Sequence, residues 1–170
     1  MSTTGPVGGA AEQPARPAGR PVRKDEIVLE EQGLYLESWL PERRSRRKPL
    51  FLLHGELGGS WLWERDLLYF AQRGWEGHAL NLRGHFWSRT VDLEETGFDA
   101  YVEDALAGYD ALGRPAVIVG HGMGGLLALR VAEERDVAGI VLLSPALPGS
   151  IRPDPPAHVV RLVPAHHRRE

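Results

Sequence analysis

The sequence contains no cysteine, and this absence removes several kinds of chemistry. A disulfide framework, a thiolate metal site and a cysteine nucleophile are all excluded. The seven histidines show no metal-ligand spacing such as H-E-x-x-H, so no metal site is predicted. We expect the protein to work without a cofactor.

An excess of charge of one sign is also missing. The 20 Lys and Arg residues stand against 23 Asp and Glu residues, which gives a formal net charge of −3. A protein that neutralises nucleic-acid phosphates over its surface carries a clear basic excess. No nucleic-acid partner is therefore expected.

Long hydrophobic runs are absent as well. The longest uncharged apolar stretch covers residues 115–129 and is shorter than the ~20 residues of a membrane-spanning helix. The first residues carry no apolar run typical of a secretory signal. A chain of 170 residues is long enough for one domain. We expect one soluble, cytoplasmic domain without a membrane partner.

Composition divides the chain into three parts. Residues 1–24 are rich in Pro, Gly and Ala and contain almost no large apolar side chain, which predicts a disordered tail. Residues 25–147 carry the apolar patterns of a folded core. Residues 148–170 return to proline and basic charge, and no further strand of comparable quality is predicted there.

Strands and helices are predicted to alternate along the core. A hairpin is expected over residues 27–40, with its turn at 31–33. The other expected elements are buried strands at 50–53, 76–82, 116–119 and 137–143, and helices at 60–73, 98–112 and 126–134. Strands that alternate with helices of this length pair in parallel through right-handed crossovers, so the expected fold class is α/β.

The most informative segment is Gly120-His121-Gly122-Met123-Gly124-Gly125, between a predicted strand and a predicted helix. One interpretation is a G-x-G-x-x-G dinucleotide site built from Gly120, Gly122 and Gly125. It lacks the acidic residue expected at the end of the next strand, where the chain reads VLLSP. The other interpretation is a G-x-S-x-G nucleophile elbow with glycine at position 122 in place of serine. Small residues on both sides of such a turn let the strand and helix backbones approach.

Two further segments support the elbow. His54-Gly55-Glu56-Leu57-Gly58-Gly59 follows one predicted strand, and Asn81-Leu82-Arg83-Gly84-His85-Phe86-Trp87-Ser88 follows the next. Together with the glycine motif, they make residues 27–147 resemble the α/β-hydrolase superfamily, in which loops of these kinds follow three successive parallel strands. The resemblance implies an α/β-hydrolase-like, mostly parallel sheet with flanking helices, truncated after the sixth strand. Residues 148–170 would then be the remnant of a cap.

Three positions depart from the family pattern. Asn81 stands where aspartate is common, and Phe86 stands where the loop usually has glycine. The third position is Gly122, which has no atom that can attack a carbonyl carbon. Acyl transfer needs an oxygen, sulfur or carboxylate there, so we expect impaired turnover of esters.

The resemblance also implies which residues form the site. The catalytic position is Gly122, and Asp154 is the candidate acid. The backbone N–H groups of Met123 and of Glu56 or Leu57 would form an oxyanion hole. The other pocket and elbow residues are His54, Gly55, Gly120, His121, Gly124, Gly125 and Trp87. A small acyl- or ester-type ligand is the expected occupant.

Two other functions remain open. An active hydrolase or lyase of the same fold would use His121, Glu56 or a bound water in place of serine. A non-enzymatic assembly half would instead dock a second copy or a partner chain through the strand at 137–143. An apolar strand with an unpaired edge tends to pair with another chain.

Overall fold

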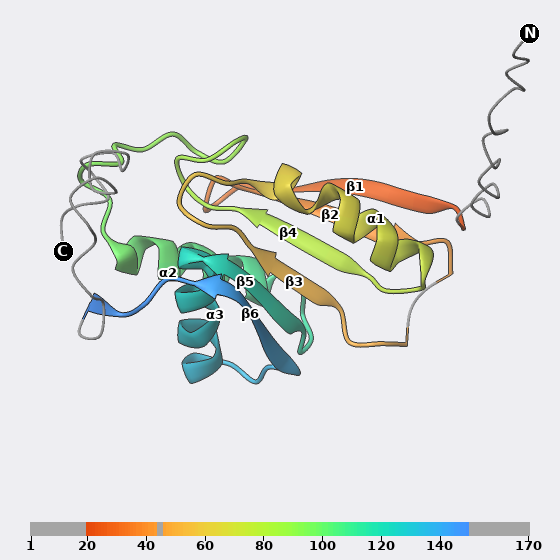
Figure 1. The fold of residues 1–170 in the computed structure, drawn as a ribbon. Coiled ribbons are helices and arrows are strands. Elements are labelled where there is room, and N and C mark those ends of the chain that lie inside the picture. Colours follow the sequence, from red (N-terminus) through yellow and green to blue (C-terminus); the bar gives the residue numbers. More distant parts are fainter. Residues whose placement is uncertain (1–19, 44–45, 150–170) are drawn as a thin grey trace, which may run out of the picture.

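The computed structural model describes residues 20–43 and 46–149, which form a six-stranded sheet with helices on both faces (Figure 1). The strand order is β1-β2-β4-β3-β5-β6. β1 (Val22–Leu29) and β2 (Leu34–Pro41) form the predicted antiparallel hairpin. Its turn ends at Gly33, whose φ of +64° is a conformation that glycine adopts without steric cost.

The first strand begins earlier than the sequence predicts. Val22 pairs with Pro41 and Lys24 pairs with Trp39, so the expected boundary of the N-terminal tail at residue 24 is wrong by a few residues. The charged residues at the start of this segment do not show the apolar pattern from which a strand is predicted. Lys24 fits into it because its Nζ lies 3.1 Å from a carboxylate oxygen of the buried Glu37 and 5.3 Å from the centroid of the Trp39 ring.

The four remaining strands run parallel to one another, as the alternation of strands and helices predicts. They are β3 (Leu50–Leu53), β4 (Gly77–Asn81), β5 (Val117–Gly122) and β6 (Gly139–Pro145). β3 pairs with both β4 and β5, β5 pairs with β6, and β2 joins β4 in the antiparallel sense. The sheet is therefore mostly parallel, and β6 is an edge strand among the described residues.

The helices cover the two faces of the sheet unequally. A short 3-10 turn, η1 (Ser60–Trp63), leads into α1 (Glu64–Gln72) on one face. α2 (Phe98–Asp110) and α3 (Met123–Glu134) lie on the other face (Figure 1). Side chains alternate across a strand, so β3 contributes Leu52 to the smaller apolar cluster with Leu67 and Phe51 to the larger cluster with Leu127.

The expected helix over residues 60–73 is interrupted because Ser60 does not cap it. The N–H of Ser60 donates to Asn81 Oδ1 at 2.8 Å, and its hydroxyl donates to Glu37 Oε2 at 3.1 Å. These contacts place residues 60–63 in a 3-10 turn before the helix. None of the helices in the described part of the chain has the length and apolarity that crossing a membrane requires.

Candidate active site

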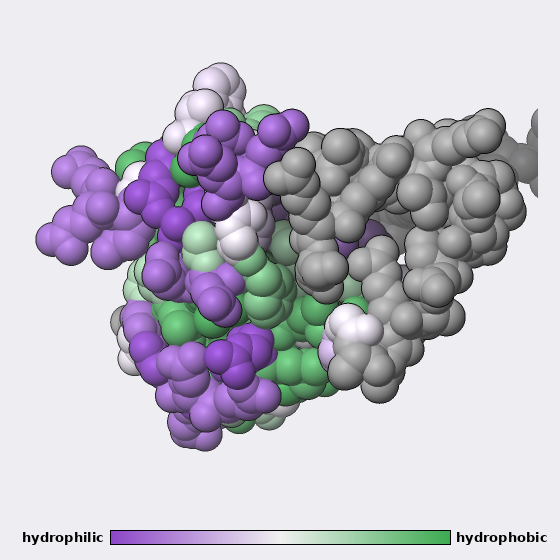
Figure 2. Space-filling view, turned by 90° about the vertical axis from the view of Figure 1, so that its left-hand side faces the viewer, coloured by the Kyte–Doolittle hydropathy of each residue, from purple (hydrophilic) through white to green (hydrophobic). Residues whose placement is uncertain are grey.

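Three loops meet where the parallel strands end. They are residues 54–59 after β3, residues 82–97 after β4, and the turn from β5 into α3. Figure 2 views this end of the molecule and shows hydrophobic residues exposed between hydrophilic ones. In sheets of this class, ligands bind outside the carboxyl ends of the strands.

The turn from β5 into α3 is a sharp elbow centred on Gly122. Its φ of 56° and ψ of −124° lie in a region that side-chain-bearing residues rarely adopt. A Cβ at Gly120 would lie 2.2 Å from Gly124 O, and a Cβ at Gly124 would lie 2.3 Å from Leu53 O. Both positions therefore require glycine, because strand, loop and helix backbones touch there. The same close packing lets α3 begin at Met123 rather than at the predicted Leu126.

The carboxylate of Glu56 lies beside the empty side-chain position of the elbow. Its Oε2 is 3.1 Å from the point where a Cβ on Gly122 would stand, and Gly55 Cα is 3.4 Å from the same point. Gly58 N–H donates to Gly55 O at 3.1 Å and closes the turn that carries Glu56. Within residues 20–43 and 46–149, the partly buried Glu56 carboxylate has no hydrogen-bond or ion-pair partner.

His54 connects the loop after β3 with the end of β4 through two hydrogen bonds. The ring is completely buried; its Nδ1–H donates to Gly55 O at 2.7 Å, and its Nε2 accepts from Leu82 N–H at 3.1 Å. This pattern requires the neutral ring. Burial lowers the pKa of His54 from 6.5 to about 4, against the smaller opposing effect of the bond to Gly55 O.

His85 joins the two loops next to the elbow. Its Nε2 lies 2.7 Å from Glu56 O, and its Nδ1 lies 2.9 Å from Arg83 O. Both partners are carbonyl oxygens, which only accept. A neutral imidazole has one N–H, so the neutral ring donates to one of these two oxygens at a time. The ring also lies against His54, with centroids 4.9 Å apart. The position of Glu56 is thereby tied to the loop after β4.

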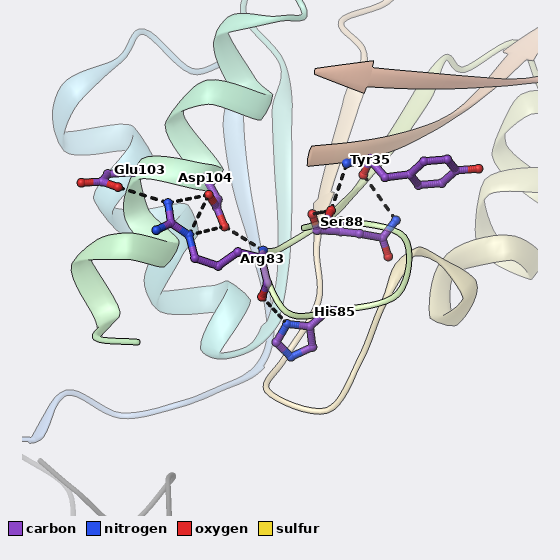
Figure 3. Close-up of polar contacts among 7 residues, drawn as sticks. Tyr35, Arg83, His85, Ser88, Glu103 and Asp104 are labelled. Atoms are coloured by element: carbon purple, nitrogen blue, oxygen red, sulfur yellow. Dashed lines mark hydrogen bonds and ion pairs between the residues drawn. The ribbon is translucent and has the colours of Figure 1, made fainter. Parts of the chain in front are cut away.

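An ion pair anchors this second loop to α2 (Figure 3). Arg83 NH2 donates to Asp104 Oδ1 at 2.8 Å and Nε donates at 3.0 Å, while the backbone N–H of Arg83 donates to Asp104 Oδ2 at 2.8 Å. Glu103 holds the outer side of the guanidinium at 3.1 Å. Asp104 is 1% exposed. Sequence reasoning missed this residue, although an acidic residue within the apolar stripe of the predicted helix at 98–112 was a usable signal.

Asn81 and Ser88 hold the start of the same loop against the hairpin. Ser88 Oγ donates to Asn81 O and accepts from Tyr35 N–H at 2.9 Å (Figure 3). Asn81 Nδ2 donates to Tyr35 O at 3.3 Å while its Oδ1 accepts the Ser60 N–H. The amide at position 81, where the family commonly has aspartate, both donates and accepts, as these partners require.

Phe86 occupies a backbone position that favours glycine. Its φ is 49°, and such a conformation costs an ordinary L-residue about 1–2 kcal/mol. Its ring packs edge-on against Tyr35, with centroids 6.1 Å apart, and against Trp87 at 5.3 Å. The predicted pocket residue Trp87 is 71% exposed beside it. Phenylalanine at this position, where the family usually has glycine, therefore places an exposed aromatic pair beside Tyr35 of β2.

The structure brings most of the predicted site residues together at one end of the sheet. Gly55, Glu56, Gly122 and the exposed His121 adjoin one another there; the ring Nδ1 of His121 would lie 3.3 Å from a Cβ on Gly55. Leu57 is exposed at the tip of its turn. Asp154 lies outside the described residues. No group of three potential metal-binding side chains occurs within the described ranges.

A cavity of about 370 Å³ lies away from the elbow. Its lining includes Pro41, Arg43 and Gly74. Pro41 ends β2, which pairs antiparallel with β4 so that Trp39 faces Gly77 at the start of β4. The cavity is thus at the amino ends of the parallel strands and is separate from the site described above.

A mostly parallel sheet with a strand–turn–helix elbow after β5 defines an α/β hydrolase fold. The family model described as alpha/beta hydrolase fold matches residues 48–164. The chain belongs to this family.

Similar proteins carry different enzyme names. A non-heme chloroperoxidase of Burkholderia pyrrocinia is 34% identical over 111 residues, covering 64% of this chain and 38% of the relative. Esterase PIR7B of Oryza sativa subsp. japonica is 32% identical over 111 residues, covering 61% and 41%. The structure of a proline iminopeptidase-related protein from Thermus thermophilus is 28% identical with a TM-score of 0.59, covering 74% of this chain and 45% of that one. The chain spans about two fifths of the length of the curated relatives it matches.

Proposed function

We propose that this protein binds a small acyl- or ester-type ligand at the elbow and does not turn esters over through an acyl-enzyme. The observation that carries the proposal is Gly122, which occupies the nucleophile position without a side chain. Removing the serine from a hydrolytic triad lowers kcat by about 10⁶ and leaves a residual effect from binding and the oxyanion hole of about 10³–10⁴ over water. Ligand binding survives such a loss because it needs no nucleophile.

The backbone around the elbow supports binding of a carbonyl oxygen. Met123 is the first residue of α3, and the first N–H groups of a helix have no acceptor within that helix. The turn carrying Glu56 and Leu57 adjoins it across Gly55. These N–H groups are the candidate oxyanion hole. The esterase name of one relative supports an ester-type ligand as the starting class.

Glu56 supplies a second reason for weak turnover. A tetrahedral adduct at this site would place a negative oxygen near the Glu56 carboxylate, which lies against the Gly122 position. Two unit negative charges about 4 Å apart repel by about 4 kcal/mol at an effective dielectric constant of ~20. The carboxylate therefore opposes the charge that ester hydrolysis develops, even if a water were activated.

Fluorophosphonate labelling of the full chain tests the absence of a nucleophile, and an ester and lactone panel tests turnover. We expect no covalent label, hydrolysis at the buffer rate, and saturable ester binding observed by NMR chemical shifts. A label mapped to a pocket side chain, or turnover that disappears in Glu56→Gln, would contradict this proposal. Either result would show that the protein is an active hydrolase that works without serine. Absence of any saturable ligand shift would remove the binding function.

A second candidate function follows from β6. Val141, Leu142 and Leu143 of this edge strand are 39–43% exposed, and apolar strands with open edges favour pairing. We propose on this observation that β6 pairs with a strand of a second copy or of a partner chain. Light scattering of the purified chain tests it.

A further inference from the structure

The cavity at the amino ends of the parallel strands has the features of a second binding site. It measures about 370 Å³, near the lower end of the range of about 300–1,000 Å³ that is usual for small-molecule pockets. It lies between the open end of the β1–β2 hairpin and the C-terminal end of α1 (Figure 1). Two basic, one acidic and three uncharged residues line it: Arg20, Arg43, Glu42, Pro41, Ala71 and Gly74.

Strand register sets the two arginines against each other. β1 and β2 pair so that Val22 lies opposite Pro41, and continuing this register by two residues sets Arg20 opposite Arg43. Both arginines line the same cavity, which agrees with this placement. Like charges at opposite positions of two antiparallel segments destabilise the pair. An anion between the two guanidinium groups would offset this repulsion.

The described part of the chain does not supply such an anion. Arg20 and Arg43 are exposed and have no hydrogen-bond or ion-pair partner within residues 20–43 and 46–149. Glu42 is the one carboxylate of the lining, so the two guanidinium groups leave one positive charge in excess. The cavity therefore favours a negatively charged ligand.

The carboxylates on the neighbouring elements are already engaged by other cations. Asp25 of β1 pairs with Arg23 at 2.8 Å. Lys24 Nζ lies 3.1 Å from Glu37 of β2 and 3.2 Å from Glu64 at the start of α1. These acidic groups are thus compensated locally and do not cancel the charge of the cavity.

The C-terminal end of α1 is also covered by cations of the chain itself. The last carbonyl groups of a helix attract positive charge. Arg47 donates from Nη1 to Arg73 O at 2.8 Å, and its guanidinium lies 5.1 Å from the centroid of the Trp75 ring. Arg73 donates from Nη1 to Tyr69 O at 3.1 Å and lies over the Tyr69 ring. The helix end therefore needs no further cation from the cavity.

The loop that follows Arg43 adds further positive charge. Arg46 and Lys48 are exposed in the same connection between β2 and β3. Surface charge of one sign around a cleft raises the local concentration of ligands of the opposite sign. The surroundings and the lining of the cavity thus favour the same class of ligand.

We infer that this cavity binds a small phosphate monoester, with its phosphate group between Arg20 and Arg43 and its organic part along Pro41 and Ala71. A guanidinium group donates two parallel N–H bonds to a phosphate or a carboxylate. A phosphate monoester carries a charge of about −1.5 to −2 at pH 7 and three acceptor oxygens, so it serves two guanidinium groups at once. A carboxylate has one charge and two oxygens. The site is separate from Gly122, and the inference does not depend on ligand binding at the elbow.

Three probes of similar size and different charge test the inference on the full chain. They are phenyl phosphate, benzoate and phenol, titrated at pH 7 and followed by NMR chemical shifts. We expect phenyl phosphate to bind about tenfold more tightly than benzoate, with saturable shifts at Ala71 and Gly74, and phenol to bind most weakly. Added salt should weaken the phosphate probe, because screening acts on the charged groups. Equal binding of the three probes would overturn the inference.

Substitution of the two arginines tests the assignment. Arg20→Gln and Arg43→Gln should each weaken phenyl phosphate by about fivefold or more, since each removes a hydrogen bond between charged groups. Lys48→Gln is the matched control, because it removes one positive charge from an exposed position of the same loop that does not line the cavity, and it should stay within about twofold of the parent chain. Unchanged affinity in both arginine variants, or an equal loss in Lys48→Gln, would overturn the assignment to the cavity.

A lipid headgroup presents the same phosphate chemistry on a surface, and a vesicle assay distinguishes this source. We expect the full chain to stay in the supernatant when vesicles of phosphatidylcholine with phosphatidic acid are sedimented. Sedimentation with these vesicles, without binding of phenyl phosphate in solution, would overturn the inference of a small ligand. Shifts around Gly122 with none at Ala71 and Gly74 would overturn it as well, because they would place the phosphate at the other end of the sheet.

Discussion

The carboxylate of Glu56 and the backbone of Gly122 border the same small space, with Oε2 3.1 Å from the Cβ position of the glycine. Residues from the loop after β3 and from the elbow after β5 meet there because the two strands pair in parallel and end at the same edge of the sheet. This relationship determines what a restored nucleophile would encounter.

Gly122→Ser is expected to lower the free energy of unfolding by up to about 1 kcal/mol without restoring ester turnover. The φ of 56° strains any residue with a Cβ, and the serine must displace the Glu56 carboxylate slightly. Urea unfolding and a p-nitrophenyl ester assay measure the two effects. Gly122→Ala is the control, since it adds the Cβ without the hydroxyl. A burst of product with the serine variant and not with the alanine variant would contradict the prediction.

Asp104→Ala is expected to lower the free energy of unfolding by about 3–5 kcal/mol. Its carboxylate is buried, and its removal leaves the Arg83 guanidinium and backbone N–H without that partner. Glu103→Ala is the matched control because this carboxylate holds the same guanidinium from an exposed position, where a pair contributes about 0–1 kcal/mol. Equal losses in the two variants would show that burial does not decide the strength of this anchor.

Gly124→Ala is expected to cost about 3 kcal/mol or more, at the upper end of the range for overpacking. The new methyl would lie 2.3 Å from Leu53 O and 2.7 Å from His54 O, and neither backbone atom can move without shifting β3. Gly139→Ala is the control, with nothing within 4 Å of the new Cβ, and should stay within about 0.5 kcal/mol of the parent chain. Thermal or urea unfolding of the two variants provides the comparison.

Stability is expected to fall as the pH drops from about 6.5 to about 4. Burial lowers the pKa of His54 in the folded chain to about 4, while the ring in the unfolded chain titrates near 6.5. The unfolded chain therefore binds more protons between these values, and the stabilisation is complete above pH 6.5 and lost on acidification. The loss from this ring is about 3 kcal/mol.

Unfolding by urea at several pH values measures this dependence. His54→Gln should flatten it, because a glutamine side chain does not titrate. His121→Gln, which changes an exposed histidine at the same end of the sheet, is the control and should keep the slope. A slope unchanged in His54→Gln would assign the pH dependence to other groups.

The full chain is expected to form an oligomer at micromolar concentrations, because β6 is an apolar strand with an unpaired edge among residues 20–43 and 46–149. Val141→Lys should weaken the association, since a lysine on an edge strand disfavours pairing. Leu129→Lys on α3 changes a side chain of similar exposure away from the strand and serves as the control. A monomeric parent chain in size-exclusion chromatography with light scattering would contradict the prediction, as would equal effects of the two variants.

Local sequence patterns predicted the elements whose partners lie close by in the chain. The apolar run at 50–53 predicts β3, and the small residues around Gly122 predict the elbow, because no larger side chain fits between β5 and α3. The patterns failed where a distant partner decides the outcome. The charged residues at the start of β1 concealed a strand because Lys24 is accepted there by the buried Glu37, which belongs to β2.

The amino-acid sequence by itself determined that position 122 has no reactive atom, because glycine lacks a side chain in every fold. It also determined the order of the three loops that surround this position. Only the tertiary structure decided what surrounds it: the parallel pairing of β3 with β5 brings Glu56 to Gly122, and the buried Asp104 holds Arg83 of the loop after β4. These contacts join residues far apart in the chain, and their geometry depends on strand register and packing, which no local pattern specifies.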